Sequence, residues 1–483
     1  MTGTRAGAAT ELCYLSATEA LERFRDRSLS PVELLDGVIA RAEAVEPTVN
    51  ALCHQRFDAA REQARAAEAR YSRGGETPRA LEGLPVAIKE EEPIAEQPWT
   101  FGSLIYADQV ADRTSELARR HLEAGAVVHA RSTTPEFSCA AFTHTRLWGV
   151  TRNPFNPELA VGGSSGGSAA SLASGTSTLA SGSDIAGSIR MPAGACGVVG
   201  FKPPHGRVPV DPPFNLDLYC HSGPLARTVA DCALYENVLA GPAAGDHTTL
   251  REPPVLPAAM PGGAGLRVAL SVDLGDWPVD DDVRANTLAV GDALREAAAT
   301  VEEVDLRLAR ADVMRAAAIH FHHGFAAILG RDVAAHPDLV NPYVADTVRW
   351  AAETSGGATQ AAGWELEAAL WAPVGALFER FDALVVPTSC VAGLDAGEDY
   401  VDARVHAGGV ALSYYLENFL TPVFNIFSRC PVLAVPSGVG ARNAPTGVQI
   451  AGRTFDDLTV FRLGAALEAV RPWDRWAAEV ALP

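Results

Sequence analysis

The sequence predicts an α/β protein organised around one β-sheet, and three observations support this fold class. Short apolar runs alternate with helical segments, as in sheets flanked by helices. The chain has 483 residues, and α/β proteins of this length often form one body around one large sheet. The composition, with 48% hydrophobic and 20% charged residues, is that of a globular protein and excludes a disordered chain, a collagen and a coiled coil.

The N-terminal part is predicted to be helical. Residues 16–19 (SATE) and 30–33 (SPVE) have the form of capping boxes. In the second of them, Pro31 falls at the first helical position, where its missing N–H costs nothing. Residues 55–72 are rich in Ala, Arg, Glu and Gln, which favours an exposed helix.

An alternation of strand and helix begins after residue 80. Residues 84–88 (LPVAI) are predicted to form a buried strand that ends at Lys89. A helix is expected over residues 115–124, and the next strand over 126–130 (AVVHA). Further buried strands are expected at residues 266–270, 384–387 and 432–435, and residues 280–380 are expected to be mostly helical.

Charge and cysteine usage exclude several classes of protein. The net charge is −20, and an acidic surface repels nucleic acids and anionic lipids. No stretch reaches the roughly 18 apolar residues of a membrane span, and the N-terminus has no apolar signal-peptide core. The eight cysteines are scattered without metal-binding spacing. We therefore expect a cytoplasmic protein with reduced thiols, no metal and no other cofactor.

The chain contains only two lysines, Lys89 and Lys202, against 37 arginines. An arginine cannot lose its proton in a protein, whereas a buried lysine can. A lysine that must act as a neutral base cannot be replaced by arginine. The composition therefore draws attention to these two positions.

Residues 162–168 (GGSSGGS) allow several interpretations. Both Ser164 and Ser165 fit the G-x-S-x-G pattern of a nucleophile elbow, which a Gly/Ser run matches easily. A phosphate-binding P-loop would need a lysine that is not nearby. The alternative to a functional site is a flexible loop. The wider stretch 149–210, dense in Gly, Ser, Ala and Pro, is too apolar for a linker and indicates close approach of backbone segments.

Three separated motifs place this run in a larger pattern. Residues 83–89 read GLPVAIK, and residues 183–202 read SDIAGSIRMPAGACGVVGFK. Together with residues 162–168, they closely resemble the amidase signature family, whose forms are G-x-P-x-x-[IV]-K-D, G-G-S-S-G-G-S and T-D-x-G-G-S-[IV]-R-x-P-A followed by G-[LF]-K-P. With smaller matches, the resemblance covers residues 15–270 and 380–475.

This resemblance implies a catalytic set of two serines and one lysine. By position, the lysine is Lys89, the serine held by a cis peptide is Ser164 and the nucleophile is Ser188. None of these three positions is altered. The family's oxyanion hole falls on the backbone N–H groups of Ile185, Ala186, Gly187 and Ser188.

The residue types suit amide cleavage in their own right. A serine hydroxyl is a weak nucleophile until a base takes its proton. A lysine is such a base only when neutral, and burial favours the neutral form by lowering the pKa. Ser164 both donates and accepts hydrogen bonds, so it can relay a proton between Ser188 and Lys89.

The sequence departs from the family next to the lysine. Glu90, Glu91 and Glu92 follow Lys89, where the family usually has one aspartate. A carboxylate close to a lysine favours its charged form, which cannot act as a base. We therefore expect all three glutamates to point away or to find partners of their own. A second departure is Ala186, where the family usually has glycine.

Two further groups of charged residues are expected to be structural. Asp184 and Arg190 flank Ser188, and we expect them to form a pair that braces the loop, because a buried charge needs a partner. Lys202 lies in a Gly-Phe-Lys-Pro sequence that resembles a framework element of the family.

The substrate pocket is less well defined by the sequence. His320, His322 and His323 cannot share one helix face, and no nearby Cys or Glu completes a metal set. The family's helical segment is its variable, substrate-facing part, so we expect His322 to line the pocket. Cys139 and Phe142 lie where the family often lines its acyl pocket, and we expect them to contact the substrate.

The resemblance implies a metal-independent amidase that forms an acyl-enzyme on Ser188 from a small-molecule amide, and a homodimer is expected. Cyclic amides, carbamates, ureas and esters remain open as substrates. The alternatives are the amidase subunit of a glutamine-dependent amidotransferase and a catalytically idle scaffold. The implied fold is a single α/β domain over residues 1–483 with a central mixed β-sheet flanked by helices. Its expected segments are N-terminal helices (1–75), a signature core (76–270), a variable helical substrate region (280–380) and a C-terminal return to the core sheet (381–483).

Overall fold

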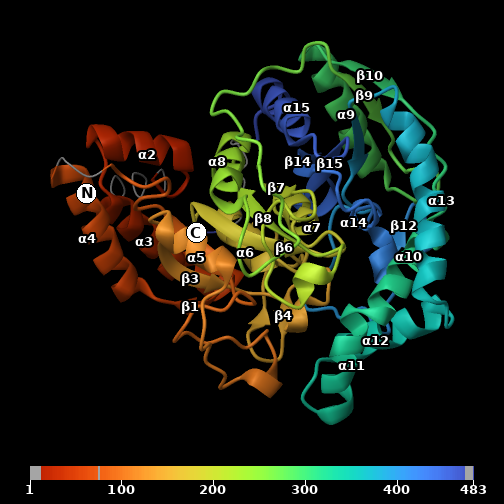
Figure 1. Cartoon of the computed structure of the whole chain (residues 1–483), viewed down its shortest axis with the longest axis horizontal. Coiled ribbons are helices and arrows are strands. Elements are labelled where there is room, and N and C mark those ends of the chain that lie inside the picture. Colours follow the sequence, from red (N-terminus) through yellow and green to blue (C-terminus); the bar gives the residue numbers. More distant parts are fainter. Residues whose placement is uncertain (1–11, 74–76, 474–481, 483) are drawn as a thin grey trace.

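An eleven-stranded mixed β-sheet forms the centre of the molecule (Figure 1). The computed structural model describes residues 12–73, 77–473 and 482. Parts of the predicted terminal segments, namely residues 1–11, 74–76, 474–481 and 483, lie outside the described residues. Helices cover both faces of the sheet, which confirms the predicted α/β fold with a central mixed sheet.

The strands run in the order β1-β3-β2-β6-β8-β7-β14-β15-β11-β9-β10 across the sheet. Strand β2 pairs in parallel with β3 and β6, and β9 pairs in parallel with β10 and β11. The remaining pairs are antiparallel. The strands are β1 (Leu52–Gln55), β2 (Pro85–Lys89), β3 (Val127–Ser132), β6 (Leu179–Asp184), β7 (Val199–Lys202), β8 (His221–Ala226), β9 (Arg267–Leu270), β10 (Thr300–Glu303), β11 (Ala383–Pro387), β14 (Val432–Val439) and β15 (Pro445–Gly452). Two small ribbons pair β4 (His144–Thr145) with β5 (Gly149–Val150) and β12 (His406–Ala407) with β13 (Val410–Ala411).

The helices form two layers. One apolar cluster joins one face of the sheet to α2 (Ala17–Asp26), α5 (Glu116–Glu123), α8 (Val229–Leu239), α9 (Asp281–Glu296) and α15 (Asp457–Val470). Other clusters join the opposite face to α6 (Gly166–Ala173), α7 (Arg190–Ala195), α10 (Arg310–His323), α11 (Phe325–Ala335), α12 (Pro342–Ser355), α13 (Gln360–Phe378) and α14 (Val423–Ile426). Helices α3 (Pro31–Val49) and α4 (Phe57–Arg73) pack together at the end of the molecule where α2 also lies (Figure 1).

Local sequence explains several of the helix starts. Ser30 and Glu33 form the complete predicted capping box at α3. Ser16 accepts a hydrogen bond from the N–H of Glu19 at the start of α2, which is one half of the predicted box. Ser115 caps α5 in the same way by accepting from the N–H of Ala118. Each cap satisfies an N–H that has no partner within its helix.

Two short strands interrupt segments that were predicted to be helical. Strand β1 lies between α3 and α4, and β10 lies between α9 and α10. Strand β1 pairs with β3 at one edge of the sheet, and β10 pairs with β9 at the other edge. Four residues carry too little periodicity to reveal a strand, so pairing with a distant partner decides their structure.

The alternation of side chains along β2 sets the position of Lys89. Val86 and Ile88 pack in the cluster on the α8 face, whereas Ala87 packs on the α6 face. Successive side chains of a strand point to opposite faces, so Lys89 shares the α6 face with Ala87. All residues of α6 are buried, and all of them except Leu172 are small. A Cβ on Gly167 would lie 2.4 Å from the backbone nitrogen of Thr133, which confirms the close approach predicted for this stretch.

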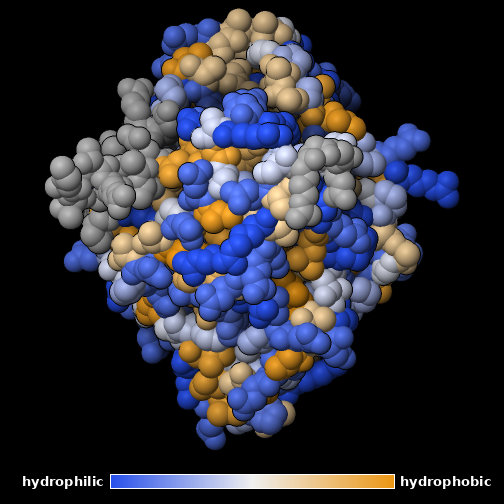
Figure 2. All heavy atoms as spheres, turned by 90° about the vertical axis from the view of Figure 1, so that its left-hand side faces the viewer, coloured by the Kyte–Doolittle hydropathy of each residue, from blue (hydrophilic) through white to orange (hydrophobic). Residues whose placement is uncertain are grey.

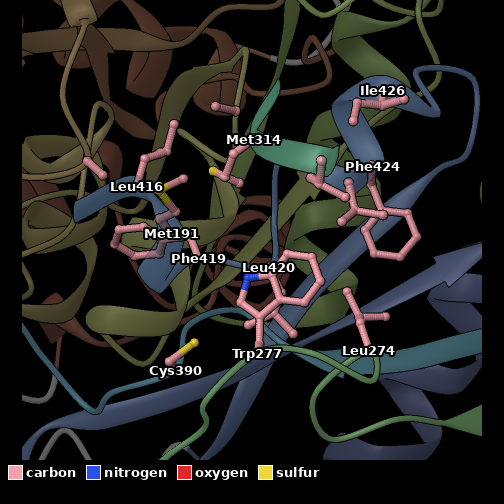
Figure 3. Packing of buried hydrophobic residues seen from close by; sticks show 14 of the residues in the cluster. Met191, Leu274, Trp277, Met314, Cys390, Leu416, Phe419, Leu420, Phe424 and Ile426 are labelled. Atoms are coloured by element: carbon pink, nitrogen blue, oxygen red, sulfur yellow. The ribbon is translucent and has the colours of Figure 1, made fainter. Parts of the chain in front are cut away.

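A large apolar cluster joins the helical region to the segment around α7. Figure 3 shows Met191 of α7 and Met314 of α10 together with Leu416, Phe419 and Leu420 of the C-terminal part. Because Met191 follows Ser188 by three residues, this cluster supports the chain segment that carries Ser188.

The surface is largely polar on the side that carries α2 and α4. Hydrophilic residues cover most of that face, with smaller apolar areas between them (Figure 2). This distribution agrees with the net charge of −20. None of the described helices has both the length and the apolar character that a membrane crossing requires.

Candidate active site

The last residue of β2 supplies the centre of the site. The side chain of Lys89 is fully buried, and its Nζ donates to Ser164 Oγ at 2.7 Å and to Ser183 Oγ at 2.9 Å. The backbone N–H of Lys89 donates to Ser181 Oγ at 3.0 Å. Burial lowers the pKa of Lys89, because removal from water disfavours the charged form, while Glu91 opposes this effect. Lys89 is therefore held among hydroxyl groups, and burial makes it lose its proton more readily than an exposed lysine does.

Ser164 lies two residues before α6, and the Gly163–Ser164 peptide bond is cis. This is the geometry that the family resemblance implies for Ser164. A Cβ on Gly163 would lie 2.5 Å from the carbonyl oxygen of Ala140, so only glycine fits before the serine. The next residue, Ser165, donates its backbone N–H to the carbonyl oxygen of Ser188 at 3.1 Å. The segment that carries Ser164 is thus joined directly to the segment that carries Ser188.

Ser188 lies in the loop between β6 and α7, and a buried ion pair braces that loop. Asp184 Oδ1 lies 2.9 Å from Arg190 Nη2, and both side chains are fully buried. Asp184 Oδ2 also accepts from the N–H of Ile189 at 3.1 Å. Arg190 extends the network to the carbonyl oxygen of Thr421 and the side chains of Gln449 and Asn425. The predicted structural role of Asp184 and Arg190 is confirmed.

One of the four backbone N–H groups predicted to form the oxyanion hole is already bound within the loop. The N–H of Gly187 donates to Asp184 Oδ1 at 2.8 Å, so the prediction that it faces a substrate is wrong. The loop turns back at this residue, with φ at +126°, and an added Cβ would lie 2.0 Å from Thr421 Oγ1. In the described residues, no protein acceptor is found for the backbone N–H groups of Ile185, Ala186 and Ser188.

The three glutamates after Lys89 do not behave alike. Glu91 Oε1 lies 3.2 Å from Lys89 Nζ, so the expectation that all three point away is wrong for Glu91. Chain reversal after β2 returns its side chain toward the lysine. Glu90 instead accepts from the N–H and hydroxyl of Thr100, and burial raises its pKa to about 7 against these hydrogen bonds. Burial and the neighbouring Glu91 raise the pKa of Glu92 to about 7.

Two adjoining cavities open beside the two serines. Ser164 and Ser183 line the larger one, and Ser188 lines the smaller one. Ser138, Ile185 and Phe325 line both, so the cavities meet between Ser164 and Ser188. The larger cavity has aromatic walls, formed by Trp99, Phe101, Phe137, Phe214 and Phe325. The smaller cavity is lined by Cys139, Ala140, Ala141, Met191 and Leu416 together with the aromatic rings of Phe321, Phe325 and Tyr415.

The three residues predicted to contact the substrate, Cys139, Phe142 and His322, lie in different surroundings. Cys139 lines the cavity of Ser188. Phe142 is 1% exposed and packs against the rings of Tyr343 and Tyr415, so its predicted contact with substrate is wrong. The predicted pocket-lining role of His322 is also wrong, because His322 lines neither cavity and its ring lies beside that of His323. Phe321, one residue earlier on the same helix, is buried and lines the cavity of Ser188.

Several site residues were missed at the sequence level. Ser138 and Phe137 come from the turn after β3, and Phe325 comes from the start of α11. No local pattern marks these residues, because they meet only through the tertiary fold. Ser183 does lie within the motif that contains Ser188, and its hydroxyl was the available signal.

The remaining polar clusters fit structural roles. Lys202 is buried, and its Nζ donates to the carbonyl oxygens of Pro203, Ser428 and Cys430. His320 Nε2 lies 2.6 Å from Asp217 Oδ1, and the His320 ring stacks on Tyr219. Among the described residues, no group of three or more His, Cys, Asp or Glu side chains is arranged to hold a metal ion.

Fold and site together define a class of hydrolases that act on carbon–nitrogen bonds. The family model Amidase matches residues 33–461. The acylamidase of Rhodococcus erythropolis is 33% identical over 96% of both chains. One of the subunits of the glutamyl-tRNA(Gln) amidotransferase of Chloroflexus aggregans is 31% identical over 96% of this chain and 98% of its own. The crystal structure of a bacterial aryl acylamidase of the amidase signature family superposes with a TM-score of 0.88 at 28% identity, over 97% of this chain and 99% of that one.

The chain therefore belongs to the amidase signature family, and it is an amidase.

Proposed function

We propose that this amidase cleaves its substrate through an acyl-enzyme on Ser188, with Lys89 as general base and Ser164 as proton relay. The observation that carries the proposal is the 2.7 Å contact between Lys89 Nζ and Ser164 Oγ in a fully buried setting. A buried amine loses its proton more readily than an exposed one. The backbone contact between Ser165 and Ser188 supports a relay toward Ser188.

The chemistry follows from these positions. Ser188 Oγ attacks the amide carbon while its proton passes to Ser164, and Ser164 passes its own proton to Lys89. The new C–O bond leaves negative charge on the carbonyl oxygen, which the N–H groups of Ile185, Ala186 and Ser188 stabilise. Collapse then breaks the C–N bond, and Lys89 returns the proton through Ser164 to the departing nitrogen. Water hydrolyses the ester by the same relay.

The two cavities suggest how the substrate lies. The departing nitrogen must receive its proton from Ser164, so the amine part belongs in the larger cavity that Ser164 lines. The acyl part then occupies the smaller cavity beside Ser188. Aromatic walls favour an aromatic amine through ring contacts, and the smaller size of the second cavity favours a short acyl group. The aryl acylamidase with a similar fold is consistent with this assignment.

The amidotransferase alternative has a specific weakness. The α-carboxylate of glutamine needs a cation in its binding site. In the described part of the chain, the one arginine or lysine that lines either cavity is Arg113. Its guanidinium already pairs with Asp211 and lies 5.5 Å from the ring centroid of Trp99. We therefore favour hydrolysis of a neutral amide over ammonia production from glutamine.

A substrate panel tests this proposal. N-aryl amides with short acyl chains, long-chain primary amides, aryl esters and L-glutamine are compared, with detection of released amine and ammonia. We expect kcat/KM to be highest among amides for the short-chain N-aryl compounds and glutamine turnover to be lowest. Release of ammonia from glutamine in preference to amine from the anilides would favour the amidotransferase interpretation. No turnover of any compound, with no covalent adduct, would favour an idle scaffold.

Chelation is expected to leave activity unchanged. The proposed steps use hydroxyl, amine and backbone groups, and the described residues offer no cluster of metal ligands. EDTA and a thiol reductant are added to enzyme under steady-state assay. Inhibition by EDTA that added metal reverses would contradict the prediction.

The cellular compartment and the oligomeric state of the protein remain predictions. All eight cysteines are free thiols in the structure, which suits the reducing cytoplasm that we propose as its compartment. The prediction of a homodimer rests on the family resemblance.

A further inference from the structure

The carboxylate of Glu91 completes the surroundings of the Lys89 amine. Three acceptors lie within reach of Nζ, namely Ser164 Oγ at 2.7 Å, Ser183 Oγ at 2.9 Å and Glu91 Oε1 at 3.2 Å. A lysine ammonium group has three N–H donors. Each donor therefore has an acceptor, although the side chain is shielded from water.

Glu91 is itself held in place from a second direction. Ser138, in the turn after β3, donates its hydroxyl to Glu91 Oε2. Burial alone would raise the pKa of Glu91, but Lys89 and the hydroxyls of Ser138 and Ser183 outweigh burial and lower it. The side chain is 17% exposed and lines the larger cavity. The carboxylate is thus fixed in its ionised form next to the amine.

Other charged or titratable groups surround Lys89 without touching its amine. Glu90 points to Thr100, and Arg131 of β3 donates to the backbone carbonyls of residues 88, 89, 90 and 92. Glu92 and Cys220 act on Lys89 through space. Asp184, at the end of β6, is paired with Arg190. Among the described residues, Glu91 is the carboxylate in ion-pair contact with Lys89.

We propose that Glu91 is the positioning residue of the general base, an inference that rests on the role of Lys89 in the proposed function. The neutral amine has two N–H groups and one lone pair. If Ser183 and Glu91 accept those two N–H groups, the lone pair faces the hydroxyl of Ser164. When Ser164 transfers its proton, the third N–H points at Ser164 Oγ. The proton moves between the two groups and no heavy atom has to change partner.

The charge of Glu91 has a second consequence. A carboxylate stabilises an ammonium ion more than a neutral amine. Glu91 therefore raises the pKa of Lys89 and opposes burial, which lowers it. Because the protonated lysine is inactive as a base, removing this negative charge shifts the onset of activity to lower pH.

The test uses Glu91→Gln, which keeps the size of the side chain and removes its charge, with Glu92→Gln as the matched control. The first readout is the rate at which a fluorophosphonate labels Ser188, measured against pH. In that reaction Ser188 Oγ forms a bond to phosphorus, the P–F bond breaks, fluoride departs, and the proton passes through Ser164 to Lys89. The second readout is ¹³C NMR of lysine Cε, in which the two lysines of the chain give two resonances.

We expect Glu91→Gln to lower the midpoint of both Lys89 titrations by about 1 to 3 pH units. Glu92→Gln should cause a smaller shift, because Glu92 does not contact the amine. The Lys202 resonance serves as an internal reference. Burial lowers the pKa of Lys202 to about 7, and the midpoint of its titration should be the same in wild type and both variants. On the plateau at high pH, Glu91→Gln should label more slowly than wild type, because its lysine is the weaker base.

A uniform loss of labelling at every pH, with an unmoved Lys89 midpoint, would mean a merely structural role and would overturn the proposal. Glu91→Asp, which draws the charge back from the amine, should shift the midpoint in the same direction by less. If Glu91→Gln does not fold, an unmoved midpoint in Glu91→Asp overturns the proposal instead. Wild-type enzyme that is never labelled on Ser188 would contradict the proposed function, while the NMR titration would still report the link between Glu91 and Lys89.

Discussion

Ser188→Ala is expected to abolish turnover, with a loss in kcat on the order of 10⁶-fold, as for other serine nucleophiles whose partners act as a unit. Ser188 is 6% exposed and lies at the wall of a cavity. In the described structure its hydroxyl makes no hydrogen bond on which the fold depends. The variant should therefore keep its fold, and intact-mass spectrometry should find no covalent adduct after fluorophosphonate treatment.

Ser72→Ala is the matched control for this experiment. Ser72 lies on the exposed side of α4, where its hydroxyl bonds to the carbonyl oxygen of Glu68 in the same helix. It should be labelled at the wild-type rate. A stoichiometric adduct on Ser188→Ala would show that another residue is the nucleophile.

Lys89→Arg is expected to be nearly as damaging as Lys89→Ala, with a loss of about 10²- to 10⁴-fold in kcat/KM. Arginine keeps a positive charge and a long side chain, but its pKa stays above about 12 and it cannot act as a neutral base. If Lys89 were a charge partner alone, arginine would partly replace it. Wild-type kcat/KM should rise with pH as Lys89 loses its proton, and burial places this rise below the usual pKa of lysine. The Arg variant should lack this rise.

The measurement is a pH–rate profile of wild type and both variants on an amide and on an activated ester. Esters should suffer less, because their leaving group needs less help from a proton. Lys202→Arg is the control for forcing a larger group into a packed site, since Lys202 is equally buried but bonds to backbone carbonyls. A folded Lys89→Arg enzyme with more than about a tenth of wild-type activity would contradict the general-base role.

The positions that define the site could be predicted because they lie in continuous motifs on regular elements. Lys89 ends a strand, so the alternation of side chains fixes its face. Ser164 and Ser188 each lie at a turn beside a short helix whose small residues allow close packing. Glu91 could not be placed in this way, because it follows the end of β2, where the chain turns and alternation no longer applies.

The cavity walls and the sheet order were beyond the reach of the sequence for a related reason. Trp99, Phe137, Phe214 and Phe325 come from four separate segments that meet only in the folded chain. Each has a local environment that would suit an ordinary core residue. The order of strands depends on contacts between distant segments, so β11, β14 and β15 enter the sheet between β7 and β9 without a local signal.

The complete burial of Lys89 and Lys202 also determines how the protein reacts with amine-directed reagents. The folded chain displays no lysine ε-amine, so acylating labels, crosslinkers and amine-reactive supports find no lysine on native molecules. Each molecule that opens exposes two such amines, and their acylation prevents correct reclosure because an acylated side chain no longer fits its site. Lysine acylation therefore reports opening without the background from surface lysines that obscures this measurement in most proteins. It counts opening events when acylation is faster than reclosing, and it reports the equilibrium population of the open form when acylation is slower.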